Sequence, residues 1–196
     1  MLHKVIWASQ AQTGLEHFYL QGGEEGIVAD GVVIGVEEGE AFRIRYQVHC
    51  GLNWRVRRVV IQSLEEDEHT LRFVSDGQGR WTDRSGLHVP ALDGCVDVDI
   101  TATPFTNTLP IRRLGLVPGA SAEIRVLYCI LPQMYVRAEP QRYTCLEAGS
   151  DGGTYRFESL SDGFTAEIRV DADGLVEDYP GLFTRVWKHA DPNRPA

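Results

Sequence analysis

The sequence predicts a mainly β protein in which a long, mostly antiparallel sheet accompanies a single short helix. Three observations predict this: apolar and polar residues alternate along many short segments, glycine-containing turns separate those segments, and one segment carries the end signals of a helix. With 196 residues, the chain is long enough to bury a hydrophobic core in one domain. We expect residues 1–190 to form that domain and the polar, proline-containing residues 191–196 to form a flexible tail.

Alternation is clearest in residues 42–49, where every second residue is apolar. That period places Phe42, Ile44, Tyr46 and Val48 on one face of a strand and the polar residues on the other. The same period returns in residues 124–130 and 164–170. Further strands are predicted at residues 4–8, 16–21, 28–36, 54–62, 70–75, 96–100, 142–146 and 155–159.

The segments between these strands contain residues typical of tight turns. Asp76-Gly77, Asp151-Gly152 and Asp173-Gly174 supply the positive φ that short hairpins need, so consecutive strands are expected to pair antiparallel with their sequence neighbours. Within residues 54–62 the alternation changes phase at Arg57-Arg58, which predicts a β-bulge there. Residues 127–131 are apolar on both faces, which indicates that something covers the second face of the sheet.

The expected cover is a helix at about residues 104–115. Pro110 suits a first helical turn, Asn107 or Thr108 could cap the helix, and Gly115 could end it. An earlier turn that begins at Pro104 would give a helix in two pieces instead.

Charge and side-chain chemistry exclude several functional classes. The formal net charge of −9 repels polyphosphates, so no nucleic-acid partner is expected. The four cysteines lie far apart without a CxxC pair, and the six histidines lack metal-ligand spacing, so we expect buried, reduced thiols and neither metal nor cofactor. No apolar run approaches the length that spans a bilayer, and residues 1–7 lack the pattern of a secretory signal, so a cytoplasmic protein without membrane insertion is expected.

Two stretches of the chain carry a family signature. The first runs from Trp81 to Leu114 and includes Leu92-Asp93-Gly94-Cys95 and Thr103-Pro104-Phe105-Thr106-Asn107; the second includes Gln141-Arg142-Tyr143-Thr144 and Asp178-Tyr179-Pro180-Gly181-Leu182-Phe183. Together they resemble the putative glycolipid-binding family of small bacterial proteins, with weaker matches over nearly the whole chain. The resemblance implies a spiral β-roll, in which a long sheet wraps around a single helix. It also implies a homodimer and a similarity to periplasmic lipoprotein-localisation factors and a mycobacterial lipid carrier.

Five polar residues near the predicted helix form the first candidate site. Asp97 and Asp99 alternate with apolar residues, so both carboxylates lie on one strand face about 7 Å apart. Ion pairs with Arg112 and Arg113 would satisfy these charges, and this is the interpretation that we favour. With Asn107, the same residues could bind a sugar or phosphate headgroup, and the carboxylate pair could serve as acid and base.

Aromatic and basic residues of the signature stretches give further candidates for ligand binding. Trp81, Tyr143 and Tyr179 could line an apolar site or stack on sugar faces, although such residues are more often part of an ordinary core. Arg142 and Arg185 each lie near an aromatic residue and could pair across the sheet or contact a ligand.

Three functional hypotheses follow from these candidates. The first is a binding protein that holds a lipid or glycolipid in the cavity of the β-roll without catalysis. The second is an enzyme that acts on a small amphiphilic substrate through Asp97 or Asp99. The third is a structural dimerisation module without a ligand.

Overall fold

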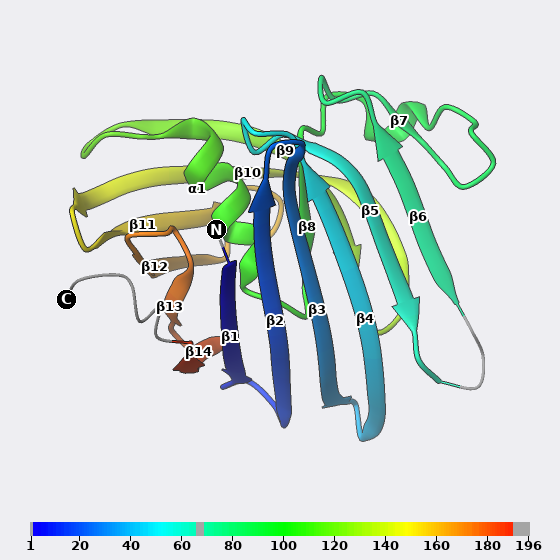
Figure 1. Cartoon of the computed structure of the whole chain (residues 1–196), viewed down its shortest axis with the longest axis horizontal. Coiled ribbons are helices and arrows are strands. Elements are labelled where there is room, and N and C mark those ends of the chain that lie inside the picture. The colour runs from blue at the N-terminus through cyan, green and yellow to red at the C-terminus, as the bar shows by residue number, and fades with distance from the viewer. Residues whose placement is uncertain (1, 66–68, 190–196) are drawn as a thin grey trace.

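The computed structural model describes residues 2–65 and 69–189, and the predicted tail at 191–196 lies outside them. The strands in these residues form one sheet of fourteen, in the order β7-β6-β5-β4-β3-β2-β1-β14-β13-β12-β11-β10-β9-β8. The described sheet is open, since β7 and β8 are its two edges. Figure 1 shows its two halves curling around a central helical segment. The predicted mainly β roll around one helix is therefore confirmed.

The first half of the sheet is an antiparallel meander in which each strand pairs with the next along the chain. Its strands are β1 (Leu2–Ser9), β2 (Gly14–Gly23), β3 (Gly26–Glu37), β4 (Glu40–Cys50), β5 (Val56–Ser63), β6 (Thr70–Ser75) and β7 (Trp81–Thr82). In β5 the register moves from Arg58 opposite His49 to Val56 opposite Cys50, which leaves Arg57 as the extra residue. The bulge predicted at Arg57-Arg58 is thus confirmed.

The second half is also mostly antiparallel, and it contains the single parallel pair of the described sheet. Its strands are β8 (Asp97–Ile100), β9 (Ser121–Ile130), β10 (Tyr135–Gly149), β11 (Gly152–Ser159), β12 (Thr165–Asp171), β13 (Val176–Tyr179) and β14 (Phe183–Lys188). The pair β8 and β9 is parallel because the helical segment crosses over between them. Strand β14 pairs antiparallel with β1, which joins the two halves.

The helical segment has two pieces, as one of the two sequence interpretations expects. A 3₁₀ turn η2 (Phe105–Asn107) continues directly into α1 (Thr108–Leu114), and Gly115 ends the helix in the left-handed conformation. Asn107 does not cap α1 with its side chain, because the backbone is already helical at that residue. Its side chain instead donates to the carbonyl oxygen of Pro104 and accepts from the hydroxyl of Tyr143. A second 3₁₀ turn, η1 (Pro90–Leu92), precedes β8.

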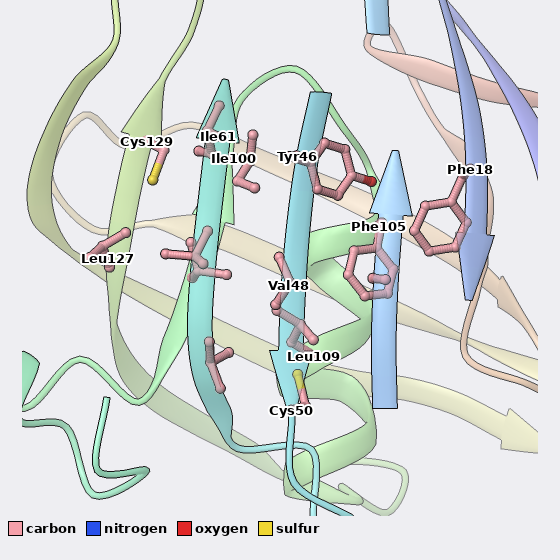
Figure 2. Close-up of a cluster of buried hydrophobic side chains, with 14 of the residues drawn as sticks. Phe18, Tyr46, Val48, Cys50, Ile61, Ile100, Phe105, Leu109, Leu127 and Cys129 are labelled. Atoms are coloured by element: carbon pink, nitrogen blue, oxygen red, sulfur yellow. The ribbon is translucent and has the colours of Figure 1, made fainter. Parts of the chain in front are cut away.

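The core fills the space between the helical segment and the sheet. Figure 2 shows Phe105 and Leu109 of this segment among side chains of β2 and β4. The ring centroids of Phe105 and Phe18 are 4.6 Å apart. A second cluster lies around Tyr143 and Phe157 in the other half of the sheet. The interior of the curled sheet is thus occupied by the protein's own side chains.

Two further expectations concern the cysteines and membrane-spanning helices. All four cysteines are free and buried, as predicted. No helix in residues 2–65 and 69–189 is long and apolar enough to cross a membrane.

Candidate functional site

Two clefts adjoin each other, and residues at the β1–β2 and β3–β4 turns line the first of them. Figure 1 shows these two turns at the lower end of the view. The first, which we call the aliphatic cleft, has a volume of about 330 Å³. Its apolar lining comes from strands of both halves and comprises Trp7, Ala11, Leu15, Val33, Ile34, Phe42, Ala102, Ile130, Leu131, Leu182 and Phe183. Glu16 is the buried carboxyl group in its wall.

The second cleft, which we call the carboxylate cleft, has a volume of about 280 Å³. Its polar lining consists of Asp99, Thr101, Thr103, Asn107, Arg137, Glu139, Gln141, Ser159 and Asp162. The two clefts share Thr101, Leu182 and Phe183, so they are neighbouring compartments of one depression. Both volumes are close to the lower limit for small-molecule sites.

A hydrogen-bonded triad of Glu16, Tyr46 and Thr103 lies between the clefts. The Tyr46 hydroxyl donates to Glu16 Oε1, and its oxygen is 3.1 Å from Thr103 Oγ1. Glu16 lines the aliphatic cleft, whereas Thr103 lines the carboxylate cleft. Because Glu16 is only 2% exposed, loss of hydration raises the pKa of its carboxyl group to about 8, although the bonds from Tyr46 and Thr103 oppose this. Glu16 is therefore a neutral acid at pH 7.

Asp99 is the sequence-predicted carboxylate that reaches a cleft. Its Oδ2 accepts from Gln141 Nε2 at 2.7 Å, and its Oδ1 accepts from Thr106 Oγ1 at 3.0 Å. Burial raises the pKa of Asp99, and these two hydrogen bonds oppose that effect. Gln141 is 1% exposed, and its Oε1 has no hydrogen-bond partner in the described part of the chain. The cleft thus contains a buried amide oxygen that is ready to accept a hydrogen bond.

A second carboxylate of this cleft is held by an arginine. Arg137 Nε donates to Glu139 Oε2 at 2.8 Å, and its guanidinium group lies 5.2 Å from the ring centroid of Tyr128. The residues that line the cleft carry three carboxyl groups, those of Asp99, Glu139 and Asp162, but only this one guanidinium group. The cleft is consequently a poor environment for an anion and a good one for hydroxyl groups, which donate to carboxylate and amide oxygens.

The structure divides the polar cluster predicted around the helix. Asp97 is fully buried and forms an ion pair with Arg113, whose Nε and Nη2 donate to Asp97 Oδ1 and Oδ2 at 3.0 and 2.6 Å. This pair is the strand-to-helix ion pair that the sequence interpretation favours. Asp99, in contrast, has no ion pair with an arginine among the described residues, and Arg112 stacks over the ring of Trp54 at 5.2 Å.

The aromatic candidates lie in three places. Tyr179 lines the carboxylate cleft together with Asn107. Tyr143 is buried behind it and donates to Asn107 Oδ1 at 2.8 Å, so it orients a residue of the cleft. Trp81 is buried in β7, where its indole nitrogen donates to the carbonyl oxygen of Cys95. Of these three aromatic side chains, the structure therefore brings one into the cleft and places one directly behind it.

The two arginine candidates make ion pairs away from both clefts. Arg142 bridges Glu123 and Glu158 across three neighbouring strands. Arg185 contacts Asp171 and Glu177. The Asp171-Ala172-Asp173-Gly174 segment is the hairpin turn that its sequence predicts, since the Gly174 amide donates to the Asp171 carbonyl oxygen at 2.8 Å. Within residues 2–65 and 69–189, no three or more histidine, cysteine, aspartate or glutamate side chains gather in a group that could hold a metal ion.

Sequence reasoning missed Glu16, Glu139 and Gln141. For Glu16 a signal was available, because it is in phase with Phe18 and Leu20, the inward residues of an alternating strand. A carboxyl group at an inward position is costly unless it is neutral or paired, and it is therefore a candidate functional residue. The same signal was available for Gln141, because it is in phase with Tyr143 and Cys145, the buried residues of an alternating strand.

Comparisons with known proteins identify relatives of this chain. A family model described as "Putative glycolipid-binding" matches residues 4–185. A crystal structure of a DUF1089 family protein from Pseudomonas aeruginosa is 39% identical, with a TM-score of 0.80 over 88% of this chain and 92% of that one. A β-barrel-like protein of family DUF1849 from Brucella abortus is 11% identical, with a TM-score of 0.58 over 95% and 96% of the two chains, and shares the fold alone. No curated protein matches the sequence.

Proposed function

This chain belongs to the putative glycolipid-binding family, and from that membership and the geometry of the clefts we propose that it binds a neutral glycolipid or a similar lipid-like amphiphile. The observation that carries the proposal is the contact between an aliphatic cleft and a carboxylate cleft, which share Thr101, Leu182 and Phe183. An amphiphile needs two such compartments next to each other. Its hydrocarbon chain would occupy the aliphatic cleft, and its headgroup would occupy the carboxylate cleft.

The aliphatic cleft suits a hydrocarbon chain because branched aliphatic and aromatic side chains line it. Removing apolar surface from water stabilises such a complex by roughly 25 cal/mol per Å². The cleft is open at the end of the roll, so a chain can enter without separation of the strands. The ligand would therefore lie at the mouth of the roll, because the interior is filled by Phe105, Leu109 and their neighbours.

The carboxylate cleft suits an uncharged, hydroxyl-rich headgroup. Asp99, Glu139 and Gln141 offer oxygens that accept hydrogen bonds from hydroxyl groups. The excess of carboxyl groups over the one guanidinium group disfavours a phosphate or sulfate group. We therefore expect a neutral sugar lipid to bind in preference to an anionic phospholipid.

Native mass spectrometry with two lipids that carry the same acyl chains tests this function. The probes are a galactosyl diacylglycerol and a phosphatidylglycerol, each with two eight-carbon chains. We expect one galactolipid molecule to bind per chain and the phospholipid to bind at least tenfold more weakly. Retention of neither lipid would contradict the proposal.

A pair of matched variants locates the binding site. Leu182→Asp places a charge in the wall that the two clefts share, whereas Leu87→Asp makes the same change at a side chain that is 66% exposed and lies outside both clefts. We expect Leu182→Asp to abolish galactolipid binding and Leu87→Asp to leave it unchanged. If both variants bind the galactolipid equally well, the clefts are not the binding site.

An enzymatic alternative depends on Asp99 alone. Asp97 is fully buried and paired with Arg113, whereas Asp99 lines the carboxylate cleft. Burial raises the pKa of Asp99, and a general acid requires a raised pKa. An enzyme of this kind would release galactose or octanoate from the galactolipid, and Asp99→Asn would stop the release. Intact galactolipid recovered from the complex after a day favours binding without catalysis.

We also propose that the chain forms a homodimer through the outer face of β14 and β1. Val186 and Trp187 are exposed there, and Trp187 lies opposite Ile6 of β1. Light scattering coupled to gel filtration measures the mass in solution. We expect a dimer for the native chain, a monomer for Trp187→Glu, and a dimer for the control Leu87→Glu. A native monomer would contradict this proposal and leave the ligand proposal standing.

A further inference from the structure

The geometry points to Glu16 as the group that recognises the ester carbonyl of a bound acyl lipid, through a hydrogen bond donated by its carboxyl group at the junction of the two clefts. This inference rests on the proposed glycolipid-binding function and adds the chemical linkage that the site selects.

The hydrogen bonds of the triad determine where the carboxyl proton lies. The Phe105 amide donates to Thr103 Oγ1 at 3.1 Å. The Tyr46 hydroxyl has one proton and donates it to Glu16 Oε1, so the Thr103 hydroxyl is the donor in its 3.1 Å contact with the Tyr46 oxygen. Glu16 Oε1 is therefore an acceptor. The proton of the neutral carboxyl group belongs on Oε2.

Glu16 Oε2 has no hydrogen-bond partner in residues 2–65 and 69–189, although the side chain is 2% exposed. A buried hydroxyl group without an acceptor costs free energy, and a ligand that supplies the acceptor recovers it. Glu16 also belongs to the wall of the aliphatic cleft, so a ligand in that cleft lies against this residue. The unpartnered atom is a donor, and the complementary ligand group is a carbonyl oxygen.

The position of Glu16 matches the position of an ester in an acyl lipid. The acyl ester joins the hydrocarbon chain to the headgroup, and the triad joins the aliphatic cleft, lined by Glu16, to the carboxylate cleft, lined by Thr103. The other buried unpartnered atom of the clefts, Gln141 Oε1, lies on the headgroup side and is an acceptor. One donor at the junction and one acceptor beyond it fit an ester followed by a sugar hydroxyl group.

The test compares two galactolipids that differ only at this linkage. The first is the galactosyl diacylglycerol with two eight-carbon ester chains, and the second is its dialkyl ether analogue, which lacks the carbonyl oxygens. Titration calorimetry at pH 7 should show that the native protein binds the ester about tenfold more tightly, which is the worth of one buried hydrogen bond. Glu16→Gln, whose amide group can still donate, should keep this preference, and Glu16→Leu should lose it.

A spectroscopic readout covers the case in which Glu16→Leu does not fold. Infrared spectroscopy of the native complex, with the ester carbonyls labelled with ¹³C, reports whether a carbonyl oxygen accepts a hydrogen bond. A carbonyl band shifted to lower frequency than in a hydrocarbon solvent supports the inference. Equal affinity for the two lipids with an unshifted band overturns it and leaves the proposed function intact. Binding of neither lipid overturns the proposed function, and this inference with it.

Discussion

Gly31 of β3 lies directly opposite Tyr46 of β4, and the ring of Tyr46 occupies the space that a side chain at residue 31 would fill. This close approach lets the Tyr46 ring lie over the backbone of Gly31 while its hydroxyl reaches Glu16 on β2. The absent side chain at Gly31 therefore positions the triad between the clefts. The glycine is required for space, because its backbone conformation is one that any residue can adopt.

Replacement of Gly31 by alanine should destabilise the protein. A Cβ at residue 31 would overlap Cε1 and Cζ of Tyr46, and overpacking of this kind costs about 1–3 kcal/mol. Gly23→Ala is the matched control, since Gly23 also lies in an inner strand of the sheet and a Cβ there meets nothing within 4 Å. Urea denaturation measures the free energy of unfolding of both variants. If the two values are the same, the position of the Tyr46 ring does not require a glycine at residue 31.

The sheet and its local irregularities could be predicted because they depend on neighbouring residues. The alternation in residues 42–49 specifies both the strand and its inward face, and the change of phase at Arg57-Arg58 locates the bulge. The short strands β7 and β13 and the strand β14 were not predicted. They contain two to six residues, and β14 is held by pairing with β1 at the other end of the chain, which no local pattern reveals.

The candidate site was predictable only in part, because it is assembled from side chains of distant segments. Asp99, Asn107 and Tyr179 were singled out from sequence and line the carboxylate cleft. Asp97 differs from Asp99 by two positions on the same strand, yet Arg113 encloses one of them and not the other. Which of the two carboxylates pairs with Arg113 depends on how α1 crosses β8. The crossing geometry of two elements cannot be predicted from the sequence alone.

The buried ion pair between Asp97 and Arg113 should be costly to break. Arg113→Met leaves a fully buried carboxyl group without its partner, and changes of this kind cost about 3–5 kcal/mol. Arg142→Met is the control, since Arg142 is partly exposed and its pairs with Glu123 and Glu158 are worth up to about 1 kcal/mol each. Removal of both charges in Asp97→Val with Arg113→Met should restore most of the stability. Chemical denaturation of all three variants checks this, and a double variant as unstable as Arg113→Met would refute it.

A buried hydrogen bond fastens the helix to the second half of the sheet. The Thr108 hydroxyl donates to the carbonyl oxygen of Gly174 at 2.7 Å. Thr108→Val has nearly the same shape but leaves that carbonyl without its donor, so we expect a loss of about 1–3 kcal/mol in thermal or urea unfolding. Thr165→Val removes a similar bond to the Phe157 carbonyl oxygen at an exposed residue, where water replaces the donor. Equal losses in the two variants would show that burial at Thr108 contributes nothing.

Glu16 should make the stability of the protein fall as the pH rises through neutrality. The pKa of its carboxyl group is about 8 in the folded protein and near 4.5 when the chain is unfolded, so between these values the folded state holds a proton that the unfolded state releases. The stabilisation is complete below pH 4.5, decreases up to pH 8 and then levels off, and a shift of this size corresponds to about 5 kcal/mol. The titratable group that faces Glu16 from β4 is Tyr46, whose pKa burial raises well above its ordinary value, while β1 and β3 place Trp7 and Val33 opposite it.

The measurement is the free energy of unfolding of the native chain and of Glu16→Gln between pH 5 and pH 9. Glutamine keeps the shape and does not titrate, so subtraction of the two profiles removes the contributions of all other groups that behave alike in both chains. We expect the native chain to lose stability relative to the variant across this range. Parallel profiles would mean that Glu16 is ionised throughout, and the donor that the ester requires would then be missing.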